Sequence, residues 1–192
     1  MDYLELGLKD KVAIVTGASE GLGRACAARF ARSEARVAMC ARRPDVLDAA
    51  ANAIRKDTGA RIFARPTDVT RAPEVEAFVA EVVRAFGGVD ILVNNAGTSS
   101  AAGFEAVDDQ AWRDDIELKV MGAIRFCRLV IPSMKQRGGG RIVLIHRLHA
   151  KRFSISLLTL EVGFIMFILE KLGLNTRNFI PDLIQLMQTL KN

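Results

Sequence analysis

The sequence predicts an α/β fold, in which helices cover both faces of a doubly wound parallel sheet. Three observations support this prediction. Short apolar runs alternate with amphipathic stretches up to about residue 145, which is the order of βαβ units. A glycine-rich turn directly follows the first apolar run. The chain has 192 residues, half of them hydrophobic, so a single sizeable core needs no disulfide or metal support.

The first half of the chain predicts two strand–helix pairs. Residues 12–16 and 36–40 are short apolar runs, typical of parallel strands that are buried on both faces. Residues 24–31 are good helix formers. Residues 44–57 begin with a proline suited to a first helical turn, carry apolar side chains on one face and end just before Gly59.

The second half predicts three further strands and two helices. A strand is expected at 61–64, and residues 75–86 repeat apolar side chains at the spacing of a core-facing helix, including Val83. Two glycines end that helix. A long helix at 108–137 is then expected between strands at 89–93 and 141–145, so five strands form the sheet.

The turn after the first strand has the glycine spacing of a phosphate site. Gly17 permits a tight turn, Gly21 lets the backbone approach a pyrophosphate, and Gly23 allows the next helix to pack closely against the strand. The N-terminus of that helix offers free N–H groups to an anion. Strand, turn and helix therefore predict a site for a dinucleotide pyrophosphate.

Two further motifs follow later strands. Asp68-Val69 comes after the third strand, and Asn94-Asn-Ala-Gly97 comes after the fourth. Together with Thr16-Gly-x-x-x-Gly-x-Gly23, they resemble the short-chain dehydrogenase/reductase family, over about three-quarters of the chain. The resemblance implies a Rossmann-like sheet that binds NAD or NADP at the carboxyl ends of its strands. It also implies hydride transfer between the nicotinamide and a small carbonyl or alcohol substrate.

The resemblance implies a role for each motif residue. The glycine turn would surround the pyrophosphate, Asp68 would accept a hydrogen bond from the adenine amino group with backbone support from Val69, and the last motif would lie along the nicotinamide ribose. For Asn94 we expect a structural amide that ties the fourth strand to its neighbours. The cofactor-binding residues expected in this way are Gly17, Ser19, Gly21, Leu22, Gly23, Asp68, Val69, Asn95, Ala96 and Gly97.

The end of the second strand favours NADP over NAD. NAD-dependent enzymes normally place a carboxylate there for the ribose 2′-hydroxyl, whereas a 2′-phosphate requires cations. The residues here are Cys40-Ala-Arg-Arg43, and Arg42 can present a planar fork to a phosphate. Glu20 in the glycine turn argues against this interpretation, because some NADP-preferring relatives carry a cation there.

The catalytic half departs from the family pattern. The resemblance implies an Asn on the long helix, a Ser after the fifth strand and a later Tyr-x-x-x-Lys that donates a proton to the carbonyl. The corresponding positions hold Lys119, Arg147, Leu160 and Phe164, and the sequence has one tyrosine, Tyr3. We therefore assign no catalytic residue and expect activity to be impaired, with the catalytic segment replaced or degenerate.

His146 and His149 lie near the expected serine position. Histidine can donate a proton near neutral pH, but the basic residues around these two disfavour imidazolium, and no carboxylate orients either ring. A solvated basic turn is the better interpretation.

The composition changes sharply after Ala150, since residues 151–192 contain no alanine. We expect residues 1–150 to form the dinucleotide-binding domain and residues 151–192 to form a divergent helical tail packed on or beside it. The sheet would then be truncated after about five strands. The apolar run 153–169 is short for a membrane span and contains an acidic residue, which favours a buried or self-associating helix. The unpaired sheet edge and this tail predict a homo-oligomer.

Composition bounds the remaining functions. The net charge of +5 is interspersed along the chain, which argues against nucleic-acid binding. Cys26, Cys40 and Cys127 are far apart and lack the spacing of a metal site. The N-terminus has two acids and no apolar run before Lys9, so we expect a cytoplasmic protein.

Three functions stay open at this point. The first is an oxidoreductase of the short-chain class, and the second is a nucleotide-binding relative that acts by association without chemistry. The third is a truncated product without function, in which a frameshifted or fused tail replaces the catalytic segment. The identity of a substrate does not follow from the sequence.

Overall fold

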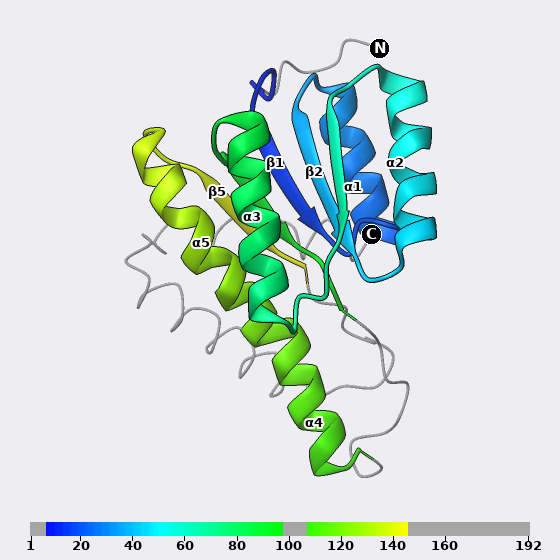
Figure 1. The fold of residues 1–192 in the computed structure, drawn as a ribbon, viewed down its shortest axis with the longest axis vertical. Coiled ribbons are helices and arrows are strands. Elements are labelled where there is room, and N and C mark those ends of the chain that lie inside the picture. The colour runs from blue at the N-terminus through cyan, green and yellow to red at the C-terminus, as the bar shows by residue number, and fades with distance from the viewer. Residues whose placement is uncertain (1–6, 98–106, 146–192) are drawn as a thin grey trace, which may run out of the picture. The chain divides into compact units, whose positions relative to one another are not determined.

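The structure, a computed structural model, describes residues 7–97 and 107–145. In this part of the chain a five-stranded parallel sheet lies between two layers of helices (Figure 1), with the strand order β3-β2-β1-β4-β5. The chain starts in the middle of the sheet and winds outward in both directions, so the predicted doubly wound fold is confirmed. The strands are β1 (Val12–Thr16), β2 (Arg36–Ala41), β3 (Ile62–Pro66), β4 (Ile91–Asn94) and β5 (Arg141–Leu144).

Helices α1 (Gly21–Arg32) and α2 (Pro44–Thr58) cover one face of the sheet. Alternate residues of β1, such as Ala13 and Val15, pack into one buried cluster with Ala27 of α1 and Leu47 of α2. The small alanine side chains let α1 approach the sheet closely. Pro44 lies in the first turn of α2 and Gly59 follows its last residue, as predicted. Gly59 adopts the left-handed conformation, with a φ of 68°.

Helices α3 (Ala72–Phe86) and α5 (Gly122–Gln136) cover the other face. Phe78 of α3 is fully buried, and its ring centroid lies 5.9 Å from that of Phe126 of α5 and 5.8 Å from that of Phe63 of β3. These aromatic contacts hold the second layer together. The prediction that Val83 faces the core is wrong, because this side chain is 37% exposed on the outer side of α3.

The long helix predicted at 108–137 is interrupted. It consists of α4 (Asp109–Ile116), one π-helical segment η2 (Glu117–Met121) and α5. The Asp108 carboxylate accepts a hydrogen bond of 2.8 Å from the Ala111 N–H and so caps α4. At η2 the helix is widened by one residue, which sequence periodicity did not predict.

The remaining differences concern element ends. Helix α1 begins at Gly21, three residues earlier than predicted, because the last glycines of the turn form its first turn. Strand β3 extends to Pro66, which an outer strand tolerates because it pairs on one side only among the described strands. The expected domain boundary near residue 150 and the helical tail lie outside the described residues.

Candidate dinucleotide site

A cavity of about 600 Å³ opens at the carboxyl ends of the strands. Parallel strands all end at this edge, and the crevice there is where open α/β sheets bind ligands. Residues at or just after the carboxyl ends of all five strands line the cavity, together with two residues of η2. Its lining consists of Gly17, Ser19, Glu20, Gly21, Leu22, Ala41, Arg42, Arg43, Thr67, Val69, Asn95, Ala96, Gly97, Leu118, Lys119 and Ile145.

Gly17 and Gly23 allow a close backbone packing at the base of the cavity that residues with a side chain would prevent. Gly17 has a φ of +61°, and a Cβ atom added there would lie 2.9 Å from the Ala96 Cα atom. A Cβ atom at Gly23 would lie 2.4 Å from the Gly17 carbonyl oxygen. Both glycines therefore serve the close approach of α1 to the ends of β1 and β4.

Gly21 is different, because its surroundings are open. Its φ is +55°, and a Cβ atom added there would have no neighbour within 4 Å. Glu20 precedes α1 as its N-cap residue but makes no side-chain hydrogen bond to the helix, which leaves the first turn without a side-chain cap. The positive end of the helix dipole and its N–H groups thus face a space large enough for an anion.

Hydrogen bonds between the ends of β1 and β4 hold the glycine turn in place. The Asn95 side-chain amide donates to the Thr16 carbonyl at 3.0 Å and to the Gly17 carbonyl at 3.1 Å. The Thr16 hydroxyl oxygen accepts from the N–H groups of Asn95 and Ala96, both at 2.9 Å. Asn95 therefore orients the backbone of the turn as well as lining the cavity.

The amide that ties β4 to the neighbouring strand is therefore that of Asn95, whereas we expected this role for Asn94. The Asn94 side chain is buried and points toward α5, where its Nδ2 lies 3.8 Å from the Cys127 sulfur. Successive residues at a strand end point to opposite sides, and the motif alone does not say which amide faces β1.

Three charged side chains surround the end of β2. Arg42 and Arg43 are exposed and line the cavity, as does Glu20 from the glycine turn. The Glu20 carboxylate accepts a hydrogen bond from the Arg43 guanidinium and forms an ion pair with it. Arg42 makes no hydrogen bond or ion pair with any residue that the structure describes. The residues at the end of β2 are Cys40-Ala-Arg-Arg43, which include no carboxylate.

Asp68 lies next to the cavity rather than in its lining. Its Oδ1 atom accepts hydrogen bonds from the Thr70 N–H at 3.0 Å and the Thr70 hydroxyl at 2.8 Å. Burial acts to raise the pKa of the Asp68 carboxyl, but these hydrogen bonds and the charges of Arg42 and Arg71 outweigh it and hold the pKa below its usual value. Asp68 is therefore ionised at neutral pH and can act as a hydrogen-bond acceptor.

Cys40 lies at the end of β2 beneath the glycine turn. Burial raises the pKa of its thiol to about 12, although a hydrogen bond from the Gly17 backbone acts in the opposite direction. The thiol is therefore protonated and unreactive at neutral pH. Cys40 acts here as a small buried side chain that supports the turn.

Lys119 lies at the other end of the cavity, in η2. Its side-chain nitrogen donates to the Asp115 carboxylate at 2.7 Å, and 23% of the side chain is exposed. A Cβ atom added at Gly97 would lie 3.7 Å from the Lys119 Cε atom, so the lysine stem passes over the end of the Asn94–Gly97 motif. This is the position at which the family resemblance leads us to expect an asparagine.

The structure brings most of the predicted residues together. All the expected cofactor-binding residues line the cavity except Gly23, which supports the turn from beneath, and Asp68. Arg147, Leu160, Phe164, His146 and His149 lie outside the described residues. Thr67 and Leu118 were missed, although Thr67 could have been found because it directly follows β3 at the same edge. The described residues contain no group of three His, Cys, Asp or Glu side chains that could hold a metal ion.

Comparison with known proteins assigns these features to one family. The family model for short chain dehydrogenases matches residues 11–156. The NAD-dependent glycerol dehydrogenase of Listeria innocua is 32% identical over 139 residues, which are 72% of this chain and 53% of that protein. That relative is named as NAD-dependent, whereas the two solved structures in the next paragraph contain NADPH. Cofactor use therefore differs among the matched proteins.

Solved structures match the fold as well as the sequence. The crystal structure of L-sorbose reductase from Gluconobacter frateurii, complexed with NADPH and L-sorbose, has a TM-score of 0.69 at 41% identity and covers 72% of this chain and 53% of its own. A single-residue variant of actinorhodin polyketide ketoreductase, solved with NADPH, has a TM-score of 0.69 at 37% identity, with coverages of 76% and 56%. The chain thus spans about half the length of these proteins. Within residues 7–97 and 107–145, no helix is apolar and long enough to cross a membrane.

Proposed function

The chain belongs to the short chain dehydrogenase family, and from this premise we propose that its cavity binds a nicotinamide dinucleotide, NADP in preference to NAD. The observation that carries the proposal is the end of β2, where Arg42 is exposed at the cavity and has no hydrogen-bonding or ion-pair partner among the described residues. A guanidinium in this state can form a bidentate, charge-assisted contact with a 2′-phosphate.

The residues present fit each part of the cofactor. The open space at Gly21 and the uncapped start of α1 suit the pyrophosphate. Asp68 is held in the ionised state that accepts a hydrogen bond from the adenine amino group. Asn95, Ala96 and Gly97 lead from the glycine turn toward Lys119 and would lie along the nicotinamide ribose. When bound, the nicotinamide would give or take the hydride in the interconversion of a carbonyl and an alcohol.

For the chemical step we propose that this chain is impaired. The Lys119 ammonium is engaged by Asp115 at 2.7 Å, whereas an amide would be neutral and able both to donate and to accept. The single tyrosine, Tyr3, precedes the first strand, so no tyrosine of this chain stands at the family's proton-donor position. A missing general acid typically costs about 10²–10⁴ in rate.

A second candidate function is nucleotide binding without turnover. It is supported by the same contrast, because most of the residues expected to bind the cofactor line the cavity, while Lys119 stands where an asparagine is expected. Under either function we propose a cytoplasmic homo-oligomer that takes a small carbonyl or alcohol substrate if it is active. Light scattering that returns the mass of one chain would exclude the oligomer.

Fluorescence titration of NADPH and NADH tests the proposed cofactor preference. We expect NADPH to bind more tightly, and Arg42→Ala to cost about 1.5–3 kcal/mol of NADPH binding with little effect on NADH. Arg141→Ala is the matched control, because Arg141 is exposed at the opposite edge of the sheet. Equal affinities of the unaltered chain for both cofactors would refute the preference, and binding of neither would refute the proposed function.

A further inference from the structure

Lys119 brings a positive charge to the end of the cavity near Gly97. Its side chain borders the cavity, whereas Asp115, the carboxylate that pairs with it, does not belong to the described lining. Asp115 lies four residues earlier, on α4, and is the one hydrogen-bond acceptor of the Lys119 Nζ atom within the described part of the chain. A lysine ammonium has three donors, so donors remain available to a ligand in the cavity.

The neighbours of Lys119 on the cavity side are mostly apolar. A smaller, adjoining cavity is lined by Lys119 together with Ala96, Leu118 and Ile145. An ammonium with unused donors beside apolar walls favours a ligand that carries a negatively charged acceptor. The apolar side chains suit an uncharged body attached to that anion.

The described lining of the main cavity has more positive than negative charge. It includes Arg42, Arg43 and Lys119 but a single carboxylate, that of Glu20, which pairs with Arg43. Arg42 is the residue proposed for the 2′-phosphate of the cofactor. Lys119 is thus the cation left for a second anionic group, at the other end of the cavity.

We propose that the substrate of this chain is a carbonyl or alcohol compound that carries a carboxylate, and that Lys119 binds this carboxylate. The inference rests on the proposed function, because it takes the end of the cavity near Gly97 as the nicotinamide end. An amide at position 119 could donate a hydrogen bond to such a ligand but would add no charge. The hydrogen bond of an ammonium to a carboxylate is about twice as strong as one between neutral groups.

The test compares the binding of benzoylformate, a 2-oxo acid, with that of benzoylformamide, its uncharged amide. The full chain is first saturated with NADP⁺, which occupies the 2′-phosphate site. NADP⁺ and a ketone both accept hydride, and benzoylformate cannot enolise, so an NMR titration that observes the probe reports binding alone. We expect benzoylformate to bind about tenfold more tightly than the amide.

Variants of the ion pair separate charge from shape. Lys119→Met keeps the length of the side chain, and we expect it to weaken benzoylformate binding about ten- to thirtyfold and to leave benzoylformamide binding almost unchanged. Lys119→Arg should retain most of the affinity, because a guanidinium also binds carboxylates. Asp115→Asn removes the competing carboxylate and should tighten benzoylformate binding about two- to fivefold, which a purely structural role of the pair would not do. Lys135→Met is the matched control, because Lys135 is exposed in the last turn of α5.

The outcomes separate this inference from the proposed function. The inference is supported if Lys119→Met weakens benzoylformate binding selectively and Asp115→Asn tightens it, while Lys135→Met changes neither probe. It is overturned if the chain loaded with NADP⁺ binds both probes equally or binds neither, or if Lys119→Met weakens both alike. The proposed function then stands, because the cofactor is bound. If the unaltered chain binds neither dinucleotide, both fall.

Discussion

The two edges of the sheet use charged and polar residues differently. At the amino edge, where the strands begin, polar groups bind one another. At the carboxyl edge, around the cavity, Arg42 and the first turn of α1 lack such partners in the described part of the chain. The comparison indicates that the contacts at the amino edge join elements of the fold, whereas those at the carboxyl edge hold the glycine turn and leave part of the polar lining of the cavity unpaired among the described residues.

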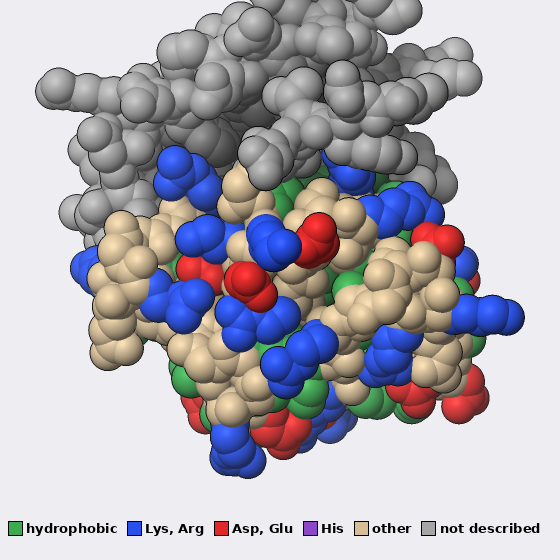
Figure 2. All heavy atoms as spheres, turned by 90° about the horizontal axis from the view of Figure 1, so that it is seen from above, with side chains coloured by type: hydrophobic (Ala, Val, Ile, Leu, Met, Phe, Trp, Pro, Cys, Tyr) green, Lys and Arg blue, Asp and Glu red, His purple; other side chains and the backbone are tan. Residues whose placement is uncertain are grey.

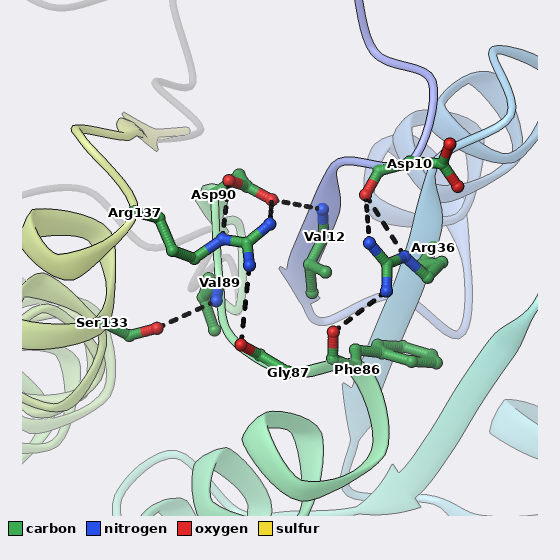
Figure 3. Close-up of polar contacts among 9 residues, drawn as sticks. All are labelled: Asp10, Val12, Arg36, Phe86, Gly87, Val89, Asp90, Ser133 and Arg137. Atoms are coloured by element: carbon green, nitrogen blue, oxygen red, sulfur yellow. Dashed lines mark hydrogen bonds and ion pairs between the residues drawn. The ribbon is translucent and has the colours of Figure 1, made fainter.

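The amino edge is built around Asp90. Its carboxylate, from the residue before β4, accepts two hydrogen bonds of 2.9 Å from the Arg137 guanidinium and one of 2.8 Å from the Val12 N–H (Figure 3). Nearby, Arg36 donates to the carbonyls of Asp10 and Phe86. These contacts join the starts of β1, β2 and β4 to the ends of α3 and α5.

Many cations nevertheless lie at this amino edge. Lys or Arg stands at or just before the first residue of every strand except β4, at positions Lys11, Arg36, Arg61 and Arg141. Figure 2, which looks onto this edge, shows the basic side chains interspersed with acidic ones. Some of them bind backbone or aromatic groups instead of acids, as in the stacking of Arg61 on Phe86 at 5.6 Å.

The largest expected effect tests whether the carboxyl edge binds without efficient chemistry. Against a panel of ketones, aldehydes and quinones, we expect turnover about 10²–10⁴ times slower than in a relative with the complete Tyr-x-x-x-Lys. The measurement is the loss of NADPH absorbance, with such a relative assayed in parallel. Rapid turnover that His146→Ala abolishes would contradict the impairment and show that this histidine acts as the proton donor.

The next effect distinguishes two glycines of the same turn. Gly23→Ala places a Cβ atom 2.4 Å from the Gly17 carbonyl oxygen, and we expect a loss of about 3 kcal/mol in the free energy of unfolding. Gly21→Ala adds its Cβ atom to open space, so only its positive φ is unfavourable, at about 1 kcal/mol. Urea denaturation followed by circular dichroism measures both. Equal losses would show that the close contact at Gly23 relaxes at little cost.

The smallest effect concerns the amino edge, where Asp90→Asn should reduce stability by about 2 kcal/mol without changing cofactor affinity. Burial acts to raise the pKa of Asp90, but the Arg137 and Val12 hydrogen bonds and nearby positive charges hold it below the usual value. The stabilisation is therefore fully present above about pH 4, the ordinary aspartate pKa, and is lost as the pH falls through the lower pKa of the folded chain.

Unfolding curves between pH 2 and 7 test this dependence. The free energies of the unaltered chain and the Asp90→Asn variant should converge at the acid end. Glu34→Gln, which removes an exposed carboxylate at the same edge, is expected to change the curve by less than about 0.5 kcal/mol. A constant difference between the unaltered chain and Asp90→Asn at all pH values would contradict an ionised Asp90 as the source of the stabilisation.

The sequence predicted the carboxyl edge better than the details of the helices. The doubly wound parallel sheet and the glycine turn follow from local patterns, since each motif directly follows an apolar run and parallel strands end together. The choice between Asn94 and Asn95 depends on the direction of a strand end, and the pair of Glu20 and Arg43 joins residues 23 positions apart. Neither feature has a local signal in the sequence. The exposure of Val83 depends likewise on what packs against α3.

The number of residues in the π-helical segment η2 fixes how α4 is rotated relative to α5. A regular α-helix advances about 100° per residue, so the additional residue in η2 turns everything before it by about that angle relative to α5. Leu118 and Lys119 line the cavity while α5 buries Phe126 and Val130 against the sheet. Deleting one residue between 117 and 121 would restore a regular helix but turn either α4 or α5 away from its present contacts. The length of this segment, more than its composition, therefore determines whether the cavity and the core can exist together.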